Sequence, residues 1–331
     1  MFNLSLQIEV YRTHRGLQVA ADSRDVLRSL PDQSVDLIVT SPPFALLRQK
    51  SYGNMEQEAY VEWLTEFGQA ALGPLKDSGS FVLDLGGAYQ RGKPVRSLYN
   101  FRVLLEFCDR LGYQLAEEFF WYNPAKLPSP IEWVNKRKVR AKDAVNTVWW
   151  FSKTENPKAD VTRVLVPYSE RMKTLLKNPS KFYTPKERPS GHDIAAAFGR
   201  ENGGAIPSNL LQIPNTDSNS HYLRTCKILG RESHPARFPS ELPRFFIEFL
   251  TDPDDLVVDI FAGSNTTGHV AEQLSRKWLS VELDRNYAAL SAIRFMEGWN
   301  EPEIRSAFDN LDREEVLSIG SEPAQAALFH N

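Results

Sequence analysis

The sequence predicts an α/β fold built on a mostly parallel, doubly wound sheet. Short apolar runs typical of buried strands, such as 35–39 and 256–261, alternate with longer segments that have the spacing of amphipathic helices. The run 256–261 leads into a loop bounded by Gly263 and Gly268, and a helical segment follows. This order of strand, glycine loop and helix is typical of the place where such sheets bind nucleotide-like ligands.

The composition is that of a globular protein of 331 residues, long enough for one large domain or two ordinary ones. Hydrophobic residues make up 42%, so a sizeable core can form. We find no apolar run long enough for a transmembrane helix, and Met1 to Gly16 lack the features of a secretory signal. Cys108 and Cys226 are the only cysteines, and no histidine spacing suggests a metal site. We therefore expect a protein of a reducing compartment such as the cytoplasm, with no disulfide framework and no metal.

Charge is distributed unevenly along the chain. The formal net charge is −3, but residues 121–190 carry 15 Lys and Arg against 6 Asp and Glu. This stretch therefore has a local charge of +9, and the remaining chain carries −12. A basic middle between acidic ends favours a face that binds a polyanion.

The first 122 residues show the alternation most clearly. Predicted strands cover 17–22, 35–40, 80–87 and 114–121, and predicted helices cover 23–30, 56–76 and 97–111. Gly112 is the expected C-cap of the last helix, because glycine tolerates the left-handed backbone that often ends a helix.

Residues 123–231 are rich in Pro, Asn, Ser and Gly, with one predicted strand at 145–151, whose Trp149 and Trp150 we expect in the core. Residues 185–219 are expected to be mostly loop. The α/β pattern then resumes with helices at 240–250, 267–276 and 285–297 and strands at 255–261 and 278–283. Residues 301–331 are polar and are expected to form a peripheral tail.

A serine and two prolines end the predicted strand at 35–40. Both prolines lack a backbone N–H and fix φ, so the strand must stop there. What remains is a hydroxyl, carbonyls without competing donors and an aromatic ring, contributed by Ser41, Pro42, Pro43 and Phe44. This is an acceptor-rich tip with a stacking face, although the segment alone also fits an ordinary strand-ending turn.

The loop 262–268 excludes two common classes of ligand. Asn265 stands where a dinucleotide fingerprint has the glycine that lets backbone approach a pyrophosphate. His269 stands where a P-loop has its phosphate-binding lysine. The loop therefore suits a nucleoside without phosphates, unless it is a merely structural turn. Glu282 ends the next predicted strand, where it can accept hydrogen bonds from ribose hydroxyls. S-adenosylmethionine meets these requirements.

These segments resemble the amino-group DNA methyltransferases of the permuted β group, in which the catalytic motif precedes the cofactor loop. The resemblance runs from about Tyr11 to Phe295 and is carried by 40–44, 126–133, 144–151, 234–239 and 259–268. It implies a Rossmann-like S-adenosylmethionine-dependent methyltransferase fold with an inserted target-recognition domain. The implied parts are a catalytic half at 1–122, a target-recognition region at 123–231, a cofactor half at 232–300 and a tail at 301–331.

The resemblance also implies roles for single residues. Ser41, Pro42, Pro43 and Phe44 would be catalytic, and Asp22 would meet the adenine, although the usual preceding glycine is Ala21 here. The full set of expected cofactor contacts is Asp22, Thr40, His234, Pro235, Phe238, Pro239, Asp259, Phe261, Gly263, Ser264, Asn265, Thr266, Thr267, Gly268 and Glu282. The expected DNA contacts are Lys136, Arg137, Lys138, Arg140 and Lys142, each of which could instead be a solvated surface charge.

The resemblance implies methyl transfer from S-adenosylmethionine to N4 of a cytosine flipped out of double-stranded DNA. The resemblance suggests the modification enzyme of a restriction–modification system with a short palindromic site such as CAGCTG, whose endonuclease shares the site but need not bind. Three alternatives stay open: adenine-N6 methylation, a non-catalytic DNA-binding protein and a small-molecule methyltransferase. The last would not explain the basic insertion. Cytosine-C5 methylation is rejected because neither Cys108 nor Cys226 follows a proline or ends a strand.

Overall fold

The computed structural model describes residues 9–44, 57–178, 200–216 and 220–320. The chain divides into two compact units, one combining Met1–Ala159 with Asn209–Asn331 and the other formed by Asp160–Ser208. The predictions made for residues 1–8, 185–199, 217–219 and 321–331 lie outside the described residues. No helix of the described ranges is long and apolar enough to cross a membrane.

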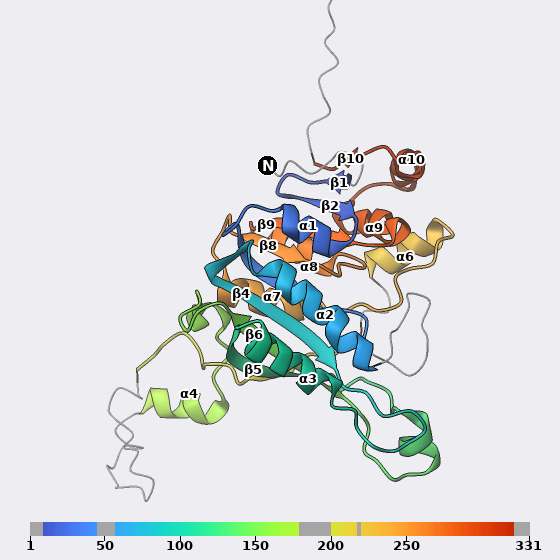
Figure 1. The fold of residues 1–331 in the computed structure, drawn as a ribbon. Coiled ribbons are helices and arrows are strands. Elements are labelled where there is room, and N and C mark those ends of the chain that lie inside the picture. Colours follow the sequence, from blue (N-terminus) through green and yellow to red (C-terminus); the bar gives the residue numbers. More distant parts are fainter. Residues whose placement is uncertain (1–8, 45–56, 179–199, 217–219, 321–331) are drawn as a thin grey trace, which may run out of the picture. The chain divides into compact units, whose positions relative to one another are not determined.

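One mixed sheet organises the larger unit, and its described strands follow the order β10-β1-β2-β9-β8-β3-β4-β6-β5-β7 (Figure 1). The middle of the sheet is parallel and consists of β2 (Gly16–Ala20), β9 (Lys277–Glu282), β8 (Leu256–Asp259), β3 (Val35–Thr40) and β4 (Leu75–Gly86). β6 (Val145–Ser152) and β5 (Gln114–Tyr122) continue it in antiparallel pairing. The edges are β7 (Leu210–Gln212), β1 (Glu9–Arg12) and β10 (Leu317–Ser318). The predicted α/β sheet is confirmed.

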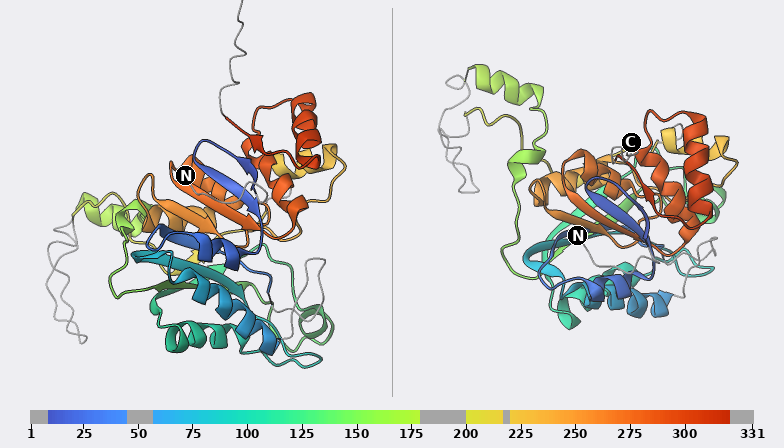
Figure 2. Two further views of the ribbon diagram at one scale, coloured as in Figure 1. Left: turned by 45° about the horizontal axis from the view of Figure 1, so that its top comes forward. Right: turned by 90° about the horizontal axis from the view of Figure 1, so that it is seen from above.

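Helices cover both faces of this sheet (Figure 2). One face carries α1 (Ser23–Ser29), α2 (Gln57–Ala71) and α3 (Tyr99–Leu105), and the other carries α7 (Glu241–Leu250), α8 (Thr266–Gln273) and α9 (Arg285–Ser291). Aromatic pairs fill both layers, for example Phe107 on Phe151 at 5.0 Å and Phe119 on Phe246 at 5.2 Å between ring centroids. Trp149 and Trp150 are buried in β6, as predicted.

The central pairing joins the two halves of the sequence. Leu37 and Ile38 of β3 pair with Val257 and Val258 of β8. All six residues of β3 and all four of β8 are buried, as expected for strands covered on both faces. The chain continues from β8 toward β9 and from β3 toward β4, which lie on opposite sides. The carboxyl ends of β3 and β8 therefore flank a topological switch point, where sheets of this kind bind ligands.

Several predicted helices end differently in the structure. The helix expected at 267–276 ends at Gln273, and the helix expected at 285–297 ends at Ser291 and continues as a 3-10 helix to Phe295. The helix expected at 56–76 stops at Ala71, and β4 already begins at Leu75, because Gly73 and Pro74 interrupt the helical pattern. The helix expected at 97–111 consists of α3 followed by a wider π-helical turn, Glu106–Arg110. Gly112 follows at φ +80°, in the left-handed region that suits glycine.

The expectation of a peripheral tail from residue 301 is wrong for its described part. α10 (Glu301–Asp312) buries Ile304, Phe308 and Leu311, and Leu317 of β10 pairs with Tyr11 of β1. The polar residues of α10 lie on its outer face. The polar composition of this segment therefore gave no indication of a packed helix.

α6 (His221–Ile228) was also missed, inside the region expected to be irregular. In the smaller unit, the described residues include α4 (Glu170–Lys177) and an antiparallel bridge between Val166 and Ala205.

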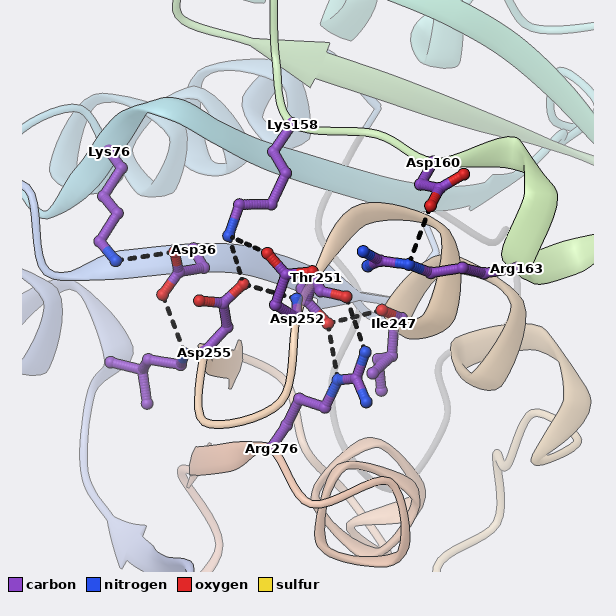
Figure 3. A network of polar contacts seen from close by, with 11 residues as sticks. Asp36, Lys76, Lys158, Asp160, Arg163, Ile247, Thr251, Asp252, Asp255 and Arg276 are labelled. Carbon is purple, nitrogen blue, oxygen red and sulfur yellow. Dashed lines mark hydrogen bonds and ion pairs between the residues drawn. The ribbon is translucent and has the colours of Figure 1, made fainter.

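Polar contacts tie the two halves together at the amino ends of β3 and β8 (Figure 3). The nearly buried Asp36 carboxylate of β3 accepts from Lys76 Nζ at 2.7 Å and from the backbone N–H of Leu256, the first residue of β8, at 3.0 Å. Lys158 Nζ binds Asp252 at 3.0 Å and Asp255 at 2.7 Å, in the turn before β8. These contacts anchor β8 beside β3 at the end of the sheet remote from the switch point.

Replacing Asp36 by alanine should lower the free energy of unfolding by about 1–3 kcal/mol, because the buried N–H of Leu256 and the ammonium of Lys76 both lose their acceptor. Urea unfolding followed by circular dichroism measures this. Asp25→Ala is the matched control, since Asp25 pairs with Arg28 on the surface, and it should change stability by less than about 0.5 kcal/mol. Equal effects of the two variants would contradict the anchoring role of Asp36.

Candidate active site

A cavity of about 490 Å³ lies at the carboxyl ends of β3 and β8. Thirteen of the predicted site residues line it: Asp22, Ser41, Pro42, Pro43, Phe44, His234, Pro235, Phe238, Phe261, Gly263, Ser264, Thr266 and Glu282. The structure thus brings together the proline segment after β3, the glycine loop after β8 and the segment before α7. A volume in this range suits a small-molecule cofactor together with a single base.

Ser41 is the first residue after β3, and the two prolines that follow keep the chain from continuing as a strand. Phe44 then packs directly on Gly86 at the end of β4. A Cβ atom built on Gly86 would come within 2.4 Å of Phe44 Cε2, so only glycine allows this approach. The ring of Phe44 is consequently held as part of the cavity wall.

Ser41 has a partner that sequence reasoning missed. Its hydroxyl donates to Asp84 Oδ2 at 2.9 Å, and Asn146 Nδ2 donates to Asp84 Oδ1 at 3.0 Å. Asp84 and Asn146 come from β4 and β6, and both line the cavity. Burial raises the pKa of the Asp84 carboxyl to about 6, against the opposing effects of Ser41, Asn146 and the charge of Lys126. A lone carboxylate in the otherwise apolar strand 81–85 was the available signal.

Three predicted cofactor residues lie behind the cavity wall and do not line the cavity: Thr40, Asp259 and Thr267. Asp259, the last residue of β8, is 1% exposed and accepts from Thr40 Oγ1 at 2.8 Å and from Thr267 Oγ1 at 2.6 Å. Its Oδ1 also accepts from the backbone N–H of Phe261 at 3.1 Å. Burial raises the pKa of this carboxyl. The contacts join the ends of β3, β8 and the first turn of α8, so Asp259 sets the position of the glycine loop.

Asn265 and Gly268 also support the loop from inside. Asn265 has φ +54°, and its Oδ1 accepts from the Gly268 N–H at 2.9 Å and from Ser280 Oγ at 2.7 Å. Its Nδ2 donates to the Tyr11 hydroxyl at 2.8 Å. A Cβ on Gly268 would come within 2.3 Å of Asn265 Oδ1. Asn265, which replaces the middle glycine of a dinucleotide fingerprint, is therefore a buried residue that stabilises the loop through hydrogen bonds.

Glu282 closes the other side of the loop. Its Oε2 accepts from the Gly263 N–H at 2.8 Å and its Oε1 accepts from the Asp284 N–H at 3.0 Å. Burial raises the pKa of this carboxyl. Each oxygen keeps acceptor capacity toward the cavity, which suits hydroxyl donors such as those of ribose. Gly263 has φ +51°, and a Cβ there would lie 3.0 Å from the ring of His234.

Asp22 is partly committed to its own helix. It caps α1 by accepting from the Arg24 N–H at 2.9 Å, and its Oδ2 pairs with the Arg24 guanidinium at 2.5 Å. The hydrogen bonds from Arg24 lower the pKa of the Asp22 carboxyl.

Trp63 and Phe67 of α2 also line the cavity, although they were not among the predicted site residues. They pack on Phe261 at 5.5 and 4.7 Å between ring centroids and make this end of the cavity apolar.

Pro239 follows the cavity-lining segment 234–238 but does not line the cavity. No cluster of three or more potential metal ligands occurs within the described ranges.

The cavity fits S-adenosylmethionine. Carboxylates of Asp22 and Glu282 stand at its wall and disfavour phosphates, whereas the sulfonium cation, the ribose hydroxyls and the adenine ring find acceptors and an apolar surface.

The predicted DNA contacts are all exposed, but two of them have structural bonds. Arg140 donates to the Pro94 carbonyl at 3.0 and 2.6 Å, and Lys142 Nζ donates to the carbonyls of Pro124 and Lys126 at 3.1 and 3.2 Å. Lys136 Nζ lies 3.3 Å from Glu132, and Arg137 stacks at 5.0 Å on Trp133. Lys138 is exposed at φ +55°. Lys126, which lines the cavity, was not among the predicted residues.

Comparison with known proteins agrees with this geometry. The chain is 58% identical to the type II methyltransferase M.PvuII of Proteus hauseri over 312 residues, which cover 94% of this chain and 93% of that protein. The solved structure of the PvuII DNA methyltransferase, cytosine-N4-specific, matches with a TM-score of 0.78 at 49% identity and covers 95% of this chain and 99% of that chain.

A putative DNA modification methylase of Thermus thermophilus, solved in complex with S-adenosyl-L-methionine, matches with a TM-score of 0.53 at 22% identity. The match covers 88% of this chain and 98% of that chain and supports the fold. The DNA methylase family, comprising N6 and N4 methyltransferases, matches residues 35–293, from β3 beyond α9. The matched range includes both the proline segment after β3 and the glycine loop after β8. The chain therefore belongs to this DNA methylase family.

Proposed function

We propose that this protein transfers a methyl group from S-adenosylmethionine to the N4 amine of a cytosine flipped out of double-stranded DNA. The observation that carries the proposal is the Ser41–Asp84 hydrogen bond at the end of β3, beside a phosphate-excluding glycine loop. The identity of 58% to M.PvuII and the likeness to the cytosine-N4-specific PvuII structure support N4 of cytosine over N6 of adenine.

The chemistry requires a better nucleophile than free cytosine offers, because the lone pair of its amine is delocalised into the ring. Ser41 donates its hydrogen to Asp84, so the serine oxygen presents lone pairs to the cavity. That oxygen and the Pro42 carbonyl can accept the two amine hydrogens and draw the nitrogen toward a tetrahedral form. When bound, S-adenosylmethionine supplies the electrophilic methyl group, and much of the rate comes from positioning.

A methylated amine is cationic and must lose a proton. Asp84 can receive it through Ser41, because the serine hydroxyl accepts from the amine while it donates to the carboxylate. With a pKa of about 6, Asp84 is charged at neutral pH yet basic enough to accept a proton. Asn146 holds the carboxylate in place from the opposite side.

DNA provides the remaining contacts. Phe44 offers a stacking surface to the flipped base, and base–aromatic stacking contributes about 1–3 kcal/mol in comparable sites. Lys136, Arg137 and Lys138 are the proposed phosphate contacts, and we retain residues 123–231 as the proposed target-recognition region.

We further propose that the protein is the cytoplasmic modification enzyme of a restriction–modification system with a CAGCTG-type site. Its endonuclease would share this site without binding to it.

Digestion of methylated DNA to nucleosides, followed by mass spectrometry, tests the product. N4-methylcytosine is expected in DNA incubated with the protein and S-adenosylmethionine. N6-methyladenine without N4-methylcytosine would refute the proposed product and favour the alternative.

Ser41→Ala should lower kcat by about 10²-fold or more and leave the dissociation constant for DNA nearly unchanged, since it removes both the acceptor for the amine and the path to Asp84. Single-turnover methylation and a fluorescence-anisotropy titration separate the two quantities. Ser34→Ala, which removes a surface hydroxyl bonded to Pro31, is the control. A parallel loss of DNA affinity would assign the segment to binding.

The methylation rate at saturating DNA and cofactor should fall as the pH drops through about 6, because protonated Asp84 can no longer accept a proton from Ser41. The deprotonated form predominates above this pKa, so the loss occurs on the acid side. Asp84→Asn should be slower at every pH and should lack this acid limb. An unchanged acid limb in Asp84→Asn would assign the titration to another group.

Glu282→Ala should raise the dissociation constant of S-adenosylmethionine about tenfold or more, because a partly buried carboxylate acceptor is worth about 1.5–3 kcal/mol. Isothermal titration calorimetry without DNA measures this. Glu297→Ala, at an exposed site after α9, is the control. An unchanged affinity in Glu282→Ala would remove this residue from the cofactor site.

A further inference from the structure

The cavity wall contains an asparagine whose amide oxygen is fully engaged by the backbone, whereas its amide nitrogen is not. This is Asn123, the residue immediately after β5. Its Oδ1 accepts from two backbone N–H groups, those of Ala125 at 3.1 Å and Asn215 at 3.2 Å. Two backbone donors on one oxygen determine which end of the amide is the oxygen. The Nδ2 group, in contrast, meets no acceptor among the described residues of the chain.

The main chain of Asn123 is held equally firmly. Its N–H donates to the Ala144 carbonyl at 2.9 Å, and its carbonyl accepts from the Lys126 N–H at 3.2 Å. Lys142 holds the carbonyls of Pro124 and Lys126 in turn. Asn123 is therefore a preorganised donor of hydrogen bonds in the cavity wall, since only its amide hydrogens remain for a ligand.

This donor belongs to the same wall as the acceptors for the amine. Asn146 of β6 pairs with Gly86 of β4 on one side and with Trp121 of β5 on the other. Asp84 precedes Gly86 by two residues, and Asn123 follows Trp121 by two residues. Both line the cavity together with Ser41 and Phe44. The wall thus presents acceptors just after the end of β3 and on β4, and a donor just after the end of β5.

A cytosine has the complementary pattern on its Watson–Crick edge: the N4 amine donates, and N3 and O2 accept. An adenine has the amine and one ring acceptor, N1, but a C–H group where cytosine has O2. We propose that Asn123 is a specificity-determining residue, whose Nδ2 donates to the N3/O2 edge of the target cytosine while Ser41 and Pro42 accept from N4. A base that lacks an acceptor there leaves a desolvated donor unpaired, which is the strongest way for a site to reject an analogue.

The proposed role is in selection of the base and not in activation of its amine. A donor at N3 or O2 favours the form in which the N4 lone pair is delocalised into the ring, so it binds the ground state without promoting attack. Loss of Asn123 should therefore appear mainly in KM for DNA and in base selectivity, with a smaller change in kcat. This inference rests on the proposed cytosine-N4 activity.

The test compares two substitutions. Asn123→Asp keeps an oxygen for the N–H groups of Ala125 and Asn215, so the local structure is retained, but it replaces the donor by an acceptor. Asn123→Ala removes the donor without adding a charge. Each is assayed on duplexes whose target base is cytosine, 3-deazacytosine, which lacks the N3 acceptor, or adenine. Asn135→Asp, in the same basic segment but outside the cavity lining, measures the cost of one added negative charge near DNA.

We expect Asn123→Asp to lower kcat/KM for cytosine about 100-fold, with unchanged melting temperature and S-adenosylmethionine affinity. The wild type should prefer cytosine over both analogues, and Asn123→Ala should reduce at least one of these preferences about tenfold or more. Preferences that stay the same in Asn123→Ala would overturn the role of Asn123. A wild-type protein that makes no N4-methylcytosine would instead refute the proposed function itself, so the two failures are distinguishable.

Discussion

The parallel pairing of β3 with β8 is the constraint on which the rest of the structure depends. The two strands are separated by more than 200 residues, yet their carboxyl ends lie side by side because Leu37 and Ile38 pair with Val257 and Val258. A buried bond from Thr40 to Asp259 at 2.8 Å closes the pair at the edge of the cavity. The proline segment and the glycine loop start directly after these strands, so the pairing places the proposed amine acceptors beside the proposed cofactor loop.

Two buried carboxylates, Asp84 and Asp259, and the half-buried Glu282 have different roles around this edge. Asp259 accepts from three groups of its own chain and is structural, whereas Glu282 holds the glycine loop and still faces the cavity. Asp84 differs from both because its partner is the hydroxyl of Ser41, which lines the cavity. Burial raises the pKa of all three, since an unpaired charge is costly in the interior. In the proposed reaction, Asp84 uses this basicity through Ser41.

The basic segment shows why charge alone does not identify DNA contacts. Arg140 donates to the carbonyl of Pro94. Lys142 donates to the carbonyls of Pro124 and Lys126 and so holds the segment that carries Asn123 and Lys126 in the cavity wall. Arginine and lysine can stabilise an irregular segment in this way because each offers several donors and no acceptor. A basic cluster in a loop-rich region can thus position the base pocket as well as attract the DNA backbone.

The sequence by itself determined the strands at the centre of the sheet, the serine and prolines that end β3, and the loop that excludes phosphates, because each depends on residues close together in the chain. Only the tertiary structure decided that Asp84 binds Ser41, that Asn146 binds Asp84 and that Asn123 lines the same cavity. Asp84 and Asn146 lie on β4 and β6, and Asn123 follows β5. They share one wall because these strands pair antiparallel in the sheet, which no local pattern specifies. It likewise decided that α10 packs on the core, because burial of one helical face depends on a surface that other segments provide.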